Sequence, residues 1–348
     1  MTTFIPQAST RRSVLKGLGL AAAGALSGTS FSFAPAARAA DPFTVRMQLG
    51  WLASNGILGE VAADKLGYFA DEGLKLEIVP GGPNIDGVAA IASGAANLGQ
   101  LSSSPSLMMA RSQGIPVKCI AAGYQKHPYT YFSLKKKPIS TPQDMVGKVI
   151  GTQATGRILL RALLAKNGIA EKDVEMKVIG SDMTPLMTGQ VDAITGWLTN
   201  IDALAILGDQ RVDLTLWDAG IHLYANPYYV SDQTLKDHPD KLQATIRAIA
   251  KGWGFVHDNP EKAVDFLVER FPNLNKESEM KAVRPIVAYS FNEATAKGGW
   301  GAMTRENWQA QIDTYNQLAQ FEKGAPKVDD VMTLSVLEAT AANRPAYG

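Results

Sequence analysis

The sequence contains little of what would indicate a disulfide scaffold, a thiol enzyme or a metal site. Its 348 residues include one cysteine and four histidines. One cysteine excludes an internal disulfide, and Cys119 has no histidine at a spacing typical of a metal site or a thiol catalyst. This cysteine lies in the apolar run 115–122. We therefore predict a buried, unreactive thiol.

An excess of charge of one sign is also missing. The 34 Lys and Arg residues nearly balance the 33 Asp and Glu residues, which leaves a formal net charge of +1. The cationic cluster at residues 135–137 precedes Pro138 and is typical of a solvated turn. Because the sequence has no long basic run and no nucleic-acid-reading motif, nucleic acid is not an expected partner.

Known catalytic motifs are absent as well. The four histidines are scattered along the chain, at His127, His222, His238 and His257. There is no G-x-S-x-G elbow, and the pair Gly81-Gly82 is too short for a phosphate-binding loop of the dinucleotide or P-loop type. We therefore predict a protein that is not an enzyme and that holds no metal and no cofactor.

The N-terminal residues 1–39 have the three parts of an export signal. Arg11 and Arg12 precede a run rich in Gly, Ala and Leu, and small residues flank the end of the segment at Ala37-Arg38-Ala39. The run is too weakly apolar to favour a membrane anchor, and no later stretch is long and apolar enough to cross a bilayer. We predict cleavage near Ala39 and a periplasmic mature protein.

Short apolar-alternating strands follow one another along the mature chain, separated by helical segments. The predicted strands are 43–51, 74–78, 96–101, 117–121, 148–151, 174–178, 191–195 and 212–216. Strands that alternate with helices indicate parallel sheets with right-handed crossovers. The order occurs twice, and the spacing of Gly94 to Asn97 matches that of Gly189 to Asp192. We therefore predict an α/β protein with two similar lobes.

The C-terminal third has the apolar stripes of amphipathic helices, for example at Leu242, Ile246, Trp253 and Trp308. These helices are expected to pack on the first lobe, with both tryptophans in the core. The chain would then cross between the lobes twice, near 123–130 and near 221–229. The predicted division is lobe I over 40–125 and 226–348, and lobe II over 126–225.

Open α/β sheets bind ligands at the carboxyl ends of their strands, beside helix N-termini. This rule selects six loops, at 51–55, 81–84, 102–104, 153–157, 181–184 and 197–200. The side chains in these loops and near the second crossing offer flat surfaces, neutral hydrogen-bonding groups and one charge of each sign. The predicted ligand-binding residues are Trp51, Asn55, Ser102, Ser103, Ser104, Thr155, Gly156, Arg157, Asp182, Trp197, Asn200 and Tyr224.

Several of these residues also have a purely structural interpretation. Trp51 lies on the inward phase of its strand, so a core position competes with a stacking role. Asp182 is most simply a helix-start residue. Arg157 opposes the dipole of the helix that it begins, which hints at a function, although a surface salt bridge would explain it equally well. Trp197 lies beyond its predicted strand and is the strongest stacking candidate.

Motifs in both predicted lobes resemble a known family. They are the runs 67–74 (GYFADEGL), 80–83 (PGGP), 93–97 (SGAAN), 147–151 (GKVIG) and 189–193 (GQVDA). They resemble periplasmic solute-binding proteins of ABC importers, in the branch serving thiamine-pyrimidine precursors, riboflavin, alkanesulfonates, taurine and nitrate. The resemblance implies a two-lobed periplasmic-binding-protein (Venus-flytrap) fold of type II with two crossover strands. It also implies a monomer that delivers a small molecule to an ABC permease and ATPase complex.

The Gly-Gly-Pro pattern is most similar to the pyrimidine and flavin members, so our first hypothesis is a receptor for a flat heteroaromatic compound. A receptor for a sulfonate, taurine or nitrate anion is the rival within the class. An enzyme of the pyrimidine-synthase type shares the fold, but the sequence lacks the Cys-rich segment of that enzyme. A sensory receptor is a third class that the sequence leaves open.

The paired arginines generate the first prediction. Replacing Arg11 and Arg12 together with Lys is expected to leave precursor in the cytoplasm, because the twin-arginine route depends on that pair. Cell fractionation and immunoblotting would measure the precursor. Val14 stands where that signal usually has Phe, so the general secretory route is the alternative. Normal maturation of the double variant would point to that alternative.

Overall fold

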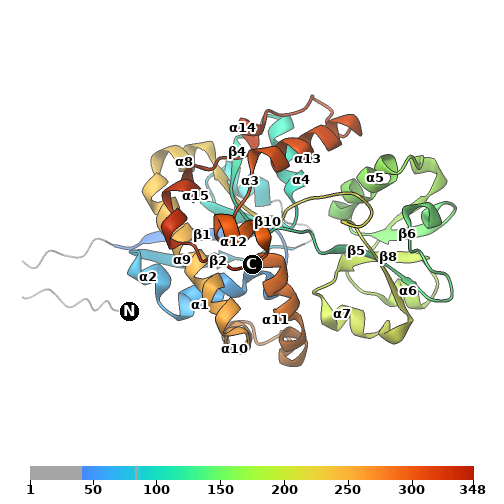
Figure 1. The fold of residues 1–348 in the computed structure, drawn as a ribbon, viewed down its shortest axis with the longest axis horizontal. Coiled ribbons are helices and arrows are strands. Elements are labelled where there is room, and N and C mark those ends of the chain that lie inside the picture. Colours follow the sequence, from blue (N-terminus) through green and yellow to red (C-terminus); the bar gives the residue numbers. More distant parts are fainter. Residues whose placement is uncertain (1–40, 83–84, 86) are drawn as a thin grey trace, which may run out of the picture. The chain divides into compact units, whose positions relative to one another are not determined.

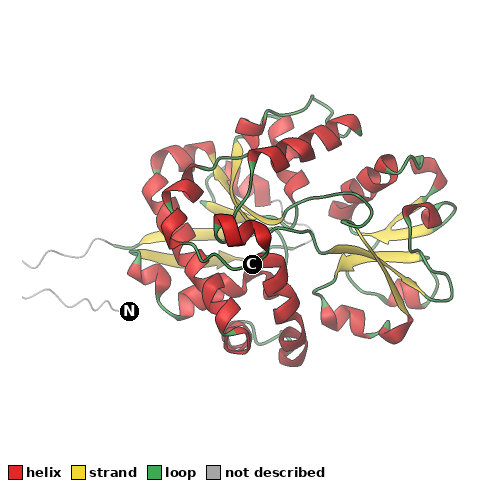
Figure 2. Cartoon of the chain, viewed as in Figure 1, coloured by secondary structure: helices red, strands yellow, loops and turns green. Residues whose placement is uncertain are grey.

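The computed structural model describes residues 41–82, 85 and 87–348. The predicted export signal at 1–39 lies outside the described residues, as do Pro83 and Asn84 of the predicted Gly-Gly-Pro loop and Asp86. The described chain contains two five-stranded sheets, each flanked by helices (Figure 1, Figure 2). This arrangement confirms the predicted α/β class.

The first sheet has the strand order β2-β1-β3-β10-β4. Strand β1 runs parallel to β2 and β3, whereas β10 is antiparallel to both β3 and β4. Apolar residues at alternate positions of β1, such as Val45 and Met47, are buried, as the sequence pattern predicts. The strands are β1 (Phe43–Leu49), β2 (Leu74–Val79), β3 (Leu98–Gln100), β4 (Val117–Tyr124) and β10 (Ala225–Ser231).

The second sheet has the order β7-β6-β8-β5-β9 and the same pairing scheme. Strand β6 is parallel to β7 and β8, and β5 is antiparallel to β8 and β9. The fourth strand in each sheet order, β10 or β5, therefore follows a strand of the other sheet in the chain. It is antiparallel to both of its neighbours. The strands are β5 (Tyr129–Leu134), β6 (Val149–Thr152), β7 (Glu175–Val178), β8 (Ala193–Trp197) and β9 (Arg211–Thr215).

Helices follow most strands of both sheets, and a helical C-terminal segment packs on the first sheet (Figure 1). The helices are α1 (Leu58–Lys65), α2 (Tyr68–Asp71), α3 (Gly87–Ala92), α4 (Ser104–Ser112), α5 (Arg157–Lys166), α6 (Thr184–Met187), α7 (Ile201–Ala205), α8 (Asp232–Asp237), α9 (Pro239–Asp258), α10 (Pro260–Arg270), α11 (Lys276–Ser290), α12 (Glu293–Gly298), α13 (Arg305–Gln317), α14 (Val328–Val331) and α15 (Ser335–Ala339). Short 3₁₀ turns cover Asn55–Ile57, Pro142–Met145, Ala154–Gly156, Glu171–Asp173, Gly208–Gln210 and Ala341–Asn343. Among the described residues, none of these helices has the length and apolar character needed to cross a bilayer.

The structure confirms most predicted elements and corrects a few. Trp253 and Trp308 are fully buried, as predicted, and Cys119 is buried with its pKa raised by loss of solvation. The predicted strand 191–195 lies two residues later, so Trp197 ends β8 instead of following it. Strand β5 and helix α11 were not predicted, because β5 continues directly from a crossing segment and α11 carries Pro285 in its interior.

The predicted internal repeat has a structural basis. Asn97 and Asp192 each precede the third strand of their sheet, and each accepts a hydrogen bond from a backbone N–H on the neighbouring strand. Asn97 Oδ1 lies 2.9 Å from Arg46 N, and Asp192 Oδ2 lies 3.0 Å from Val149 N. Equivalent strands of the two lobes are thus held by the same hydrogen bond from a backbone N–H to a side-chain oxygen.

The first sheet lies on a core in which α1 and α9 approach closely. Gly59 of α1 and Gly252 of α9 face each other, and a Cβ atom on Gly252 would lie 2.0 Å from the Gly59 carbonyl oxygen. A Cβ atom on Gly59 would lie 2.2 Å from the Trp253 ring. The two helices can pack at this distance only because both positions lack a side chain. A separate cluster fills the second lobe between β5, β8, α6 and α7: Phe132, Leu134, Met183, Leu186, Val191, Ile194, Leu204 and Leu207.

This packing predicts that Gly252→Ala destabilises the protein. Overpacking a core costs about 1–3 kcal/mol, which outweighs the ~1 kcal/mol that Ala gains over Gly inside a helix. The free energy of unfolding, measured by urea denaturation, is expected to fall.

Gly254→Ala is the matched control, because it lies in the same helix and its added Cβ would meet a proline side chain at 3.1 Å instead of a backbone carbonyl. It is expected to lose less stability than Gly252→Ala. Equal stability of the two variants would contradict the close-packing account.

Candidate ligand-binding site

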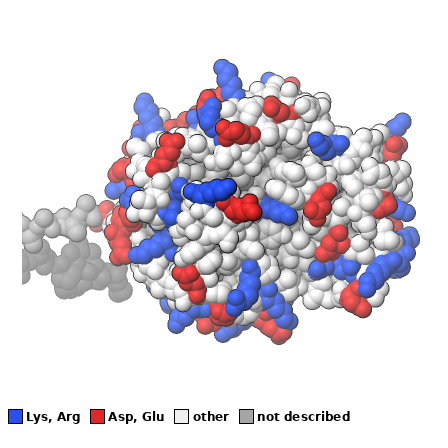
Figure 3. All heavy atoms as spheres, viewed as in Figure 1, with Lys and Arg blue, Asp and Glu red and all other residues white. Residues whose placement is uncertain are grey.

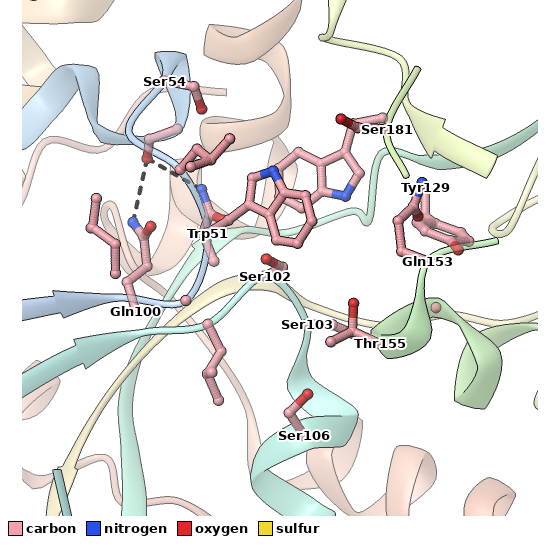
Figure 4. Close-up of a pocket in the computed structure, with 18 of the residues that line it drawn as sticks. Trp51, Ser54, Gln100, Ser102, Ser103, Ser106, Tyr129, Gln153, Thr155 and Ser181 are labelled. Atoms are coloured by element: carbon pink, nitrogen blue, oxygen red, sulfur yellow. Dashed lines mark hydrogen bonds between the residues drawn. The ribbon is translucent and has the colours of Figure 1, made fainter. Parts of the chain in front are cut away.

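A cavity of about 470 Å³ lies where strand ends of the two sheets meet (Figure 4). The first sheet contributes the segments after β1 and β3, including Trp51 and Ser102. The second sheet contributes the segments after β6 and β8, including Gln153 and Asn200. A volume of this size is typical of small-molecule sites, and its position at the carboxyl ends of strands follows the rule for open α/β sheets.

The loops on the first-lobe side are held together by contacts to backbone carbonyl groups. Gln48 donates from Nε2 to the carbonyl oxygens of Leu49 and Pro80, at 2.9 and 3.0 Å. Gly81 packs on the segment after β1, where an added Cβ atom would lie 2.2 Å from the Leu49 carbonyl oxygen and 2.5 Å from that of Trp51. Gly81, the first residue of the Gly-Gly-Pro motif, therefore supplies the close approach that places Trp51 at the cavity.

Two tryptophans line the cavity, one from each lobe. Trp51 follows β1 and is half-buried, and Figure 4 shows its ring in the middle of the site. Trp197 ends β8, where it pairs with Tyr129 of β5. Its ring lies 6.0 Å from that of Tyr124 and 5.6 Å from that of His127, measured between centroids. These contacts fix the Trp197 ring at the junction of the two sheets.

A chain of hydroxyls and one amide forms the second-lobe wall. The hydroxyls of Tyr129 and Thr152 lie 2.8 Å apart, and those of Thr152 and Thr195 lie 2.9 Å apart. The Thr195 hydroxyl also lies 3.2 Å from Gln153 Oε1. Burial raises the pKa of Tyr129 to about 12, so its hydroxyl stays protonated. This wall is polar and uncharged.

A second network lies behind the first-lobe wall, around the buried carboxyl of Glu60 on α1. The Tyr228 hydroxyl donates to Glu60 Oε1 across 2.5 Å, and Gln100 Nε2 lies 3.4 Å from the same atom. Burial raises the pKa of Glu60 to about 7, although the hydrogen bond from Tyr228 favours the ionised form. The Gly56 carbonyl oxygen accepts from both Gln100 and Asn226, which line the cavity.

The described part of the cavity lining carries no formal charge. None of its described residues is Asp, Glu, Lys or Arg, whereas both signs of charge are scattered over the face of the molecule drawn in Figure 3. His127, which is 2% exposed, has its pKa lowered to about 3 by burial, against a weaker opposing interaction with the Ser102 backbone. Its Nδ1 accepts a hydrogen bond from Tyr129 N, so the neutral ring carries its proton on Nε2.

The structure brings together part of the predicted site. Seven predicted residues line the cavity: Trp51, Ser102, Ser103, Thr155, Gly156, Trp197 and Asn200. Five others do not belong to its lining: Asn55, Ser104, Arg157, Asp182 and Tyr224. The core interpretation of Trp51 does not hold, because the first strand ends at Leu49 and the chain bends there.

Three of the five excluded residues are buried and occupied by structural contacts. Tyr224 packs against Trp308, and its hydroxyl accepts from Thr304 N at 3.2 Å. The Ser104 hydroxyl donates to Gln311 Oε1 at 2.6 Å. Asn55 donates from Nδ2 to the Thr199 carbonyl oxygen at 3.4 Å and so links the two lobes beside the cavity.

The two predicted charged residues are exposed and lie outside the cavity lining. Arg157 begins α5 and is exposed. Asp182 accepts hydrogen bonds from the backbone N–H and the hydroxyl of Thr184, at 3.1 and 2.9 Å. These contacts agree with the structural interpretation, in which Asp182 lies at the start of a helix.

The sequence did not single out several cavity residues: Gln100, His127, Tyr129, Gln153, Thr195 and Asn226. The rule for strand ends could have selected two of them, since Gln100 ends β3 and Gln153 follows β6. The others lie on or beside the crossing strands β5 and β10, or on the inward face of β8. Only the sheet order shows that these strands border the cavity.

The sheet orders, the two crossing strands and the cavity at the strand ends define a two-lobed periplasmic-binding-protein fold of type II, as predicted. Solved structures with this fold are similar. The alkanesulfonate-binding protein SsuA of Xanthomonas axonopodis, bound to MOPS, aligns with a TM-score of 0.65 at 17% identity and covers 84% of this chain and 100% of its own. At this identity the likeness shows the fold alone.

A family model described as NMT1/THI5 like matches residues 54–263, more than half of the chain. The chain belongs to this family, which confirms the branch that its motifs resemble. The riboflavin-binding protein RibY of Chloroflexus aurantiacus is 27% identical over 59% of this chain and 61% of its own length. The formylaminopyrimidine-binding protein of Halalkalibacterium halodurans is 25% identical over 80% and 87%.

Enzymes also occur among the relatives. A 4-amino-5-hydroxymethyl-2-methylpyrimidine phosphate synthase of Legionella pneumophila is 22% identical over 66% of this chain and 74% of its own length. The match to the riboflavin-binding relative spans only about three fifths of that protein. Membership of the family therefore determines neither the ligand nor whether the protein binds it or converts it. The properties of the site have to decide both.

Trp197 generates the prediction for this site. Trp197→Ala is expected to weaken ligand binding roughly ten- to a hundredfold, because a stacked aromatic contact contributes about 0.5–1.5 kcal/mol beyond the area it buries. Trp197→Phe is expected to be intermediate. Calorimetric affinity and melting temperature would be measured on the same samples.

Trp217→Ala is the matched control, since Trp217 is a half-buried tryptophan that stacks on His222 outside this cavity. It is expected to leave the affinity unchanged. If Trp197→Ala lost much of its stability, about 3–5 kcal/mol for a core Trp, while the folded fraction bound normally, the stacking role would be wrong.

Proposed function

We propose that this protein is the solute-binding component of an ABC importer, which captures an uncharged, flat heteroaromatic molecule between its lobes outside the cytoplasm. The described lining, which is uncharged and includes Trp51 and Trp197, carries this proposal. The lobes are 40–125 with 226–348, and 126–225. An ABC permease and ATPase complex is the proposed partner, and the mature protein is proposed to be periplasmic.

The absence of charge from the described lining favours a neutral ligand. Taking a charged ligand out of water costs several kcal/mol per ion unless an opposite charge or a full set of hydrogen bonds replaces the water. Arg157, the one cationic side chain among the predicted ligand-binding residues, is exposed and outside the lining. A sulfonate or nitrate would have to rely on the hydroxyls near the start of α4, such as Ser103 and Ser106.

The same lining favours binding over catalysis. Its described residues include no Lys, Cys, Asp or Glu, and its histidine is held neutral with one ring nitrogen occupied. The polar groups that remain are hydroxyls and amides, which suit recognition by hydrogen bonds. Two relatives whose printed names state a bound compound, riboflavin and a formylaminopyrimidine, are consistent with a heteroaromatic ligand.

A screen of the mature protein against four compounds tests the proposal. The compounds are 4-amino-5-hydroxymethyl-2-methylpyrimidine, riboflavin, taurine and nitrate. At least one heterocycle is expected to raise the melting temperature, because a ligand at a hundred times its Kd stabilises the folded state by about 2.7 kcal/mol. Calorimetry would then give the Kd.

Binding of taurine or nitrate without either heterocycle would overturn the proposed ligand class and support the anion receptor. Chromatography of each bound compound after prolonged incubation supplies a second readout. Recovery of the unchanged compound is expected, and a product would support the synthase class instead. Permease and ATPase genes beside this gene would favour transport over a sensory role.

A further inference from the structure

Two glutamine side chains line the cavity from different lobes, and in both the NH₂ group of the amide is turned into the protein. Gln100 ends β3 of the first sheet, and Gln153 follows β6 of the second. Figure 4 shows them on opposite sides of Trp51. Each amide has two N–H donors and one oxygen that can accept two hydrogen bonds. Their use of these groups determines what the cavity offers to a ligand.

The amide of Gln153 is fixed by three contacts. Its Nε2 donates to the carbonyl oxygens of Gly180 and Thr195, at 3.1 and 3.0 Å, which uses both hydrogens. Its Oε1 receives the Thr195 hydroxyl at 3.2 Å. A flipped amide would set Oε1 against two carbonyl oxygens, so the orientation is determined. The remaining lone pair of Oε1 is the only hydrogen-bonding capacity left on this half-buried side chain.

The amide of Gln100 is fixed in the same sense. Its Nε2 lies 3.3 Å from the Gly56 carbonyl oxygen, 3.4 Å from Glu60 Oε1 and 3.2 Å from the Tyr228 hydroxyl. A flip would bring Oε1 against the Gly56 oxygen and the Glu60 carboxyl. No described residue donates a hydrogen bond to Gln100 Oε1. Gln100 belongs to the cavity lining, and Figure 4 shows its amide oxygen on the side of Trp51, so this oxygen faces the cavity.

We infer that Gln100 Oε1 and Gln153 Oε1 form an acceptor pair, one from each lobe, that selects ligands with N–H donors on two edges of a flat ring. The inference rests on the proposed function and adds the residues that decide between related heterocycles. Hydroxyl groups of the wall, such as those of Ser102 and Ser106, can rotate to donate or accept. The two amides cannot, since their hydrogens are already used.

A fixed acceptor discriminates more sharply than a rotatable hydroxyl. A ligand that lacks the matching donor leaves a buried acceptor without water and without a partner, which is more costly than the bond itself is favourable. The effect is about tenfold in affinity for each acceptor left unpaired. The walls behind the amides are themselves hydrogen-bonded, so they resist the shift that would relieve such a mismatch.

The test compares two ligands of nearly equal size, 2,4-diaminopyrimidine and 2,4-dimethylpyrimidine, at a pH at which both are uncharged. Each methyl group replaces an amino group and removes its N–H donors. NMR titration of the mature protein is expected to show that the diamino compound binds at least tenfold more tightly. Equal affinities would overturn the acceptor pair while leaving the proposed function intact.

Variants assign the discrimination to the two residues. Gln100→Met and Gln153→Met are each expected to reduce the ratio of the two affinities, and the double variant is expected to abolish it. A purely structural role would weaken both ligands alike and preserve the ratio, which would overturn the inference. Gln190→Met, at an exposed position of the second lobe outside the cavity lining, is expected to keep the wild-type ratio.

The four-compound screen separates the two possible failures. If neither the diamino nor the dimethyl compound binds and neither heterocycle of the screen binds, the proposed function is wrong. The inference of an acceptor pair is then wrong as well. If a heterocycle of the screen binds but the double variant retains the preference for the amino groups, only the acceptor pair is wrong. Folding of every variant would be checked by its melting temperature.

Discussion

The exchange of strands between the two sheets is the constraint on which the site depends. Strand β10 lies antiparallel between β3 and β4, and β5 lies antiparallel between β8 and β9. Each strand is therefore held by two ladders of backbone hydrogen bonds in the sheet that it enters. Both walls of the cavity take residues from these strands, Tyr129 from β5 and Asn226 from β10. The cavity consequently sits where the lobes are joined.

The same exchange explains why so many aromatic side chains meet at the junction. Tyr124 ends β4 at the first crossing, and its ring contacts those of Trp197, Trp253 and Tyr289. Trp197 thereby rests on residues of the first lobe although it belongs to the second sheet. An aromatic contact tolerates a small rotation better than a hydrogen bond, which depends steeply on angle. Aromatic packing thus suits a joint between two lobes.

Neutrality of the cavity is built from burial and from paired polar groups. Besides the tyrosines, His127 lies in the described wall and Glu60 lies behind it, and loss of solvation shifts the pKa of each in the direction that favours the neutral form. The pKa of His127 falls to about 3, and that of Glu60 rises to about 7. In both cases a hydrogen-bonded neighbour fixes the orientation of the side chain, Tyr129 N for the histidine and the Tyr228 hydroxyl for the glutamate. Burial and hydrogen bonding together give a wall that recognises shape and hydrogen-bonding pattern.

Much of the fold could be predicted because alternation of apolar residues reports strands directly. The rule for strand ends then located the segments that carry Trp51, Ser102 and Trp197. Tyr224 was selected for its place near the second crossing, and it lies outside the lining, because the sequence does not tell which way a side chain turns beside a crossing. The hydroxyl of Tyr224 faces the start of α13, a segment that is 80 residues later in the chain.

The roles of the Gln100 and Gln153 amides could not be predicted from the sequence, for a related reason. Nothing in the residues around Gln100 or Gln153 marks them as fixed acceptors. Gln153 obtains its orientation from Gly180 and Thr195, 27 and 42 residues away, and Gln100 from partners up to 128 residues away. A sequence pattern reports which residues are buried, whereas the direction of a buried amide depends on backbone groups brought together by the whole sheet.

The remaining question is what would link the lobes across the cavity once a ligand is present. Direct contacts between them already exist beside it, from Asn55 to Thr199 and from Ser278 of α11 to Asp202 of α7. The hydrogen bonds described for Gln153 stay within the second lobe, and those of Gln100 stay within the first. Beside the rotatable hydroxyls, each side offers one fixed amide oxygen and one tryptophan ring. A flat ligand with donors on two edges would satisfy both sides at once, so its binding energy would depend on how closely the two lobes approach each other.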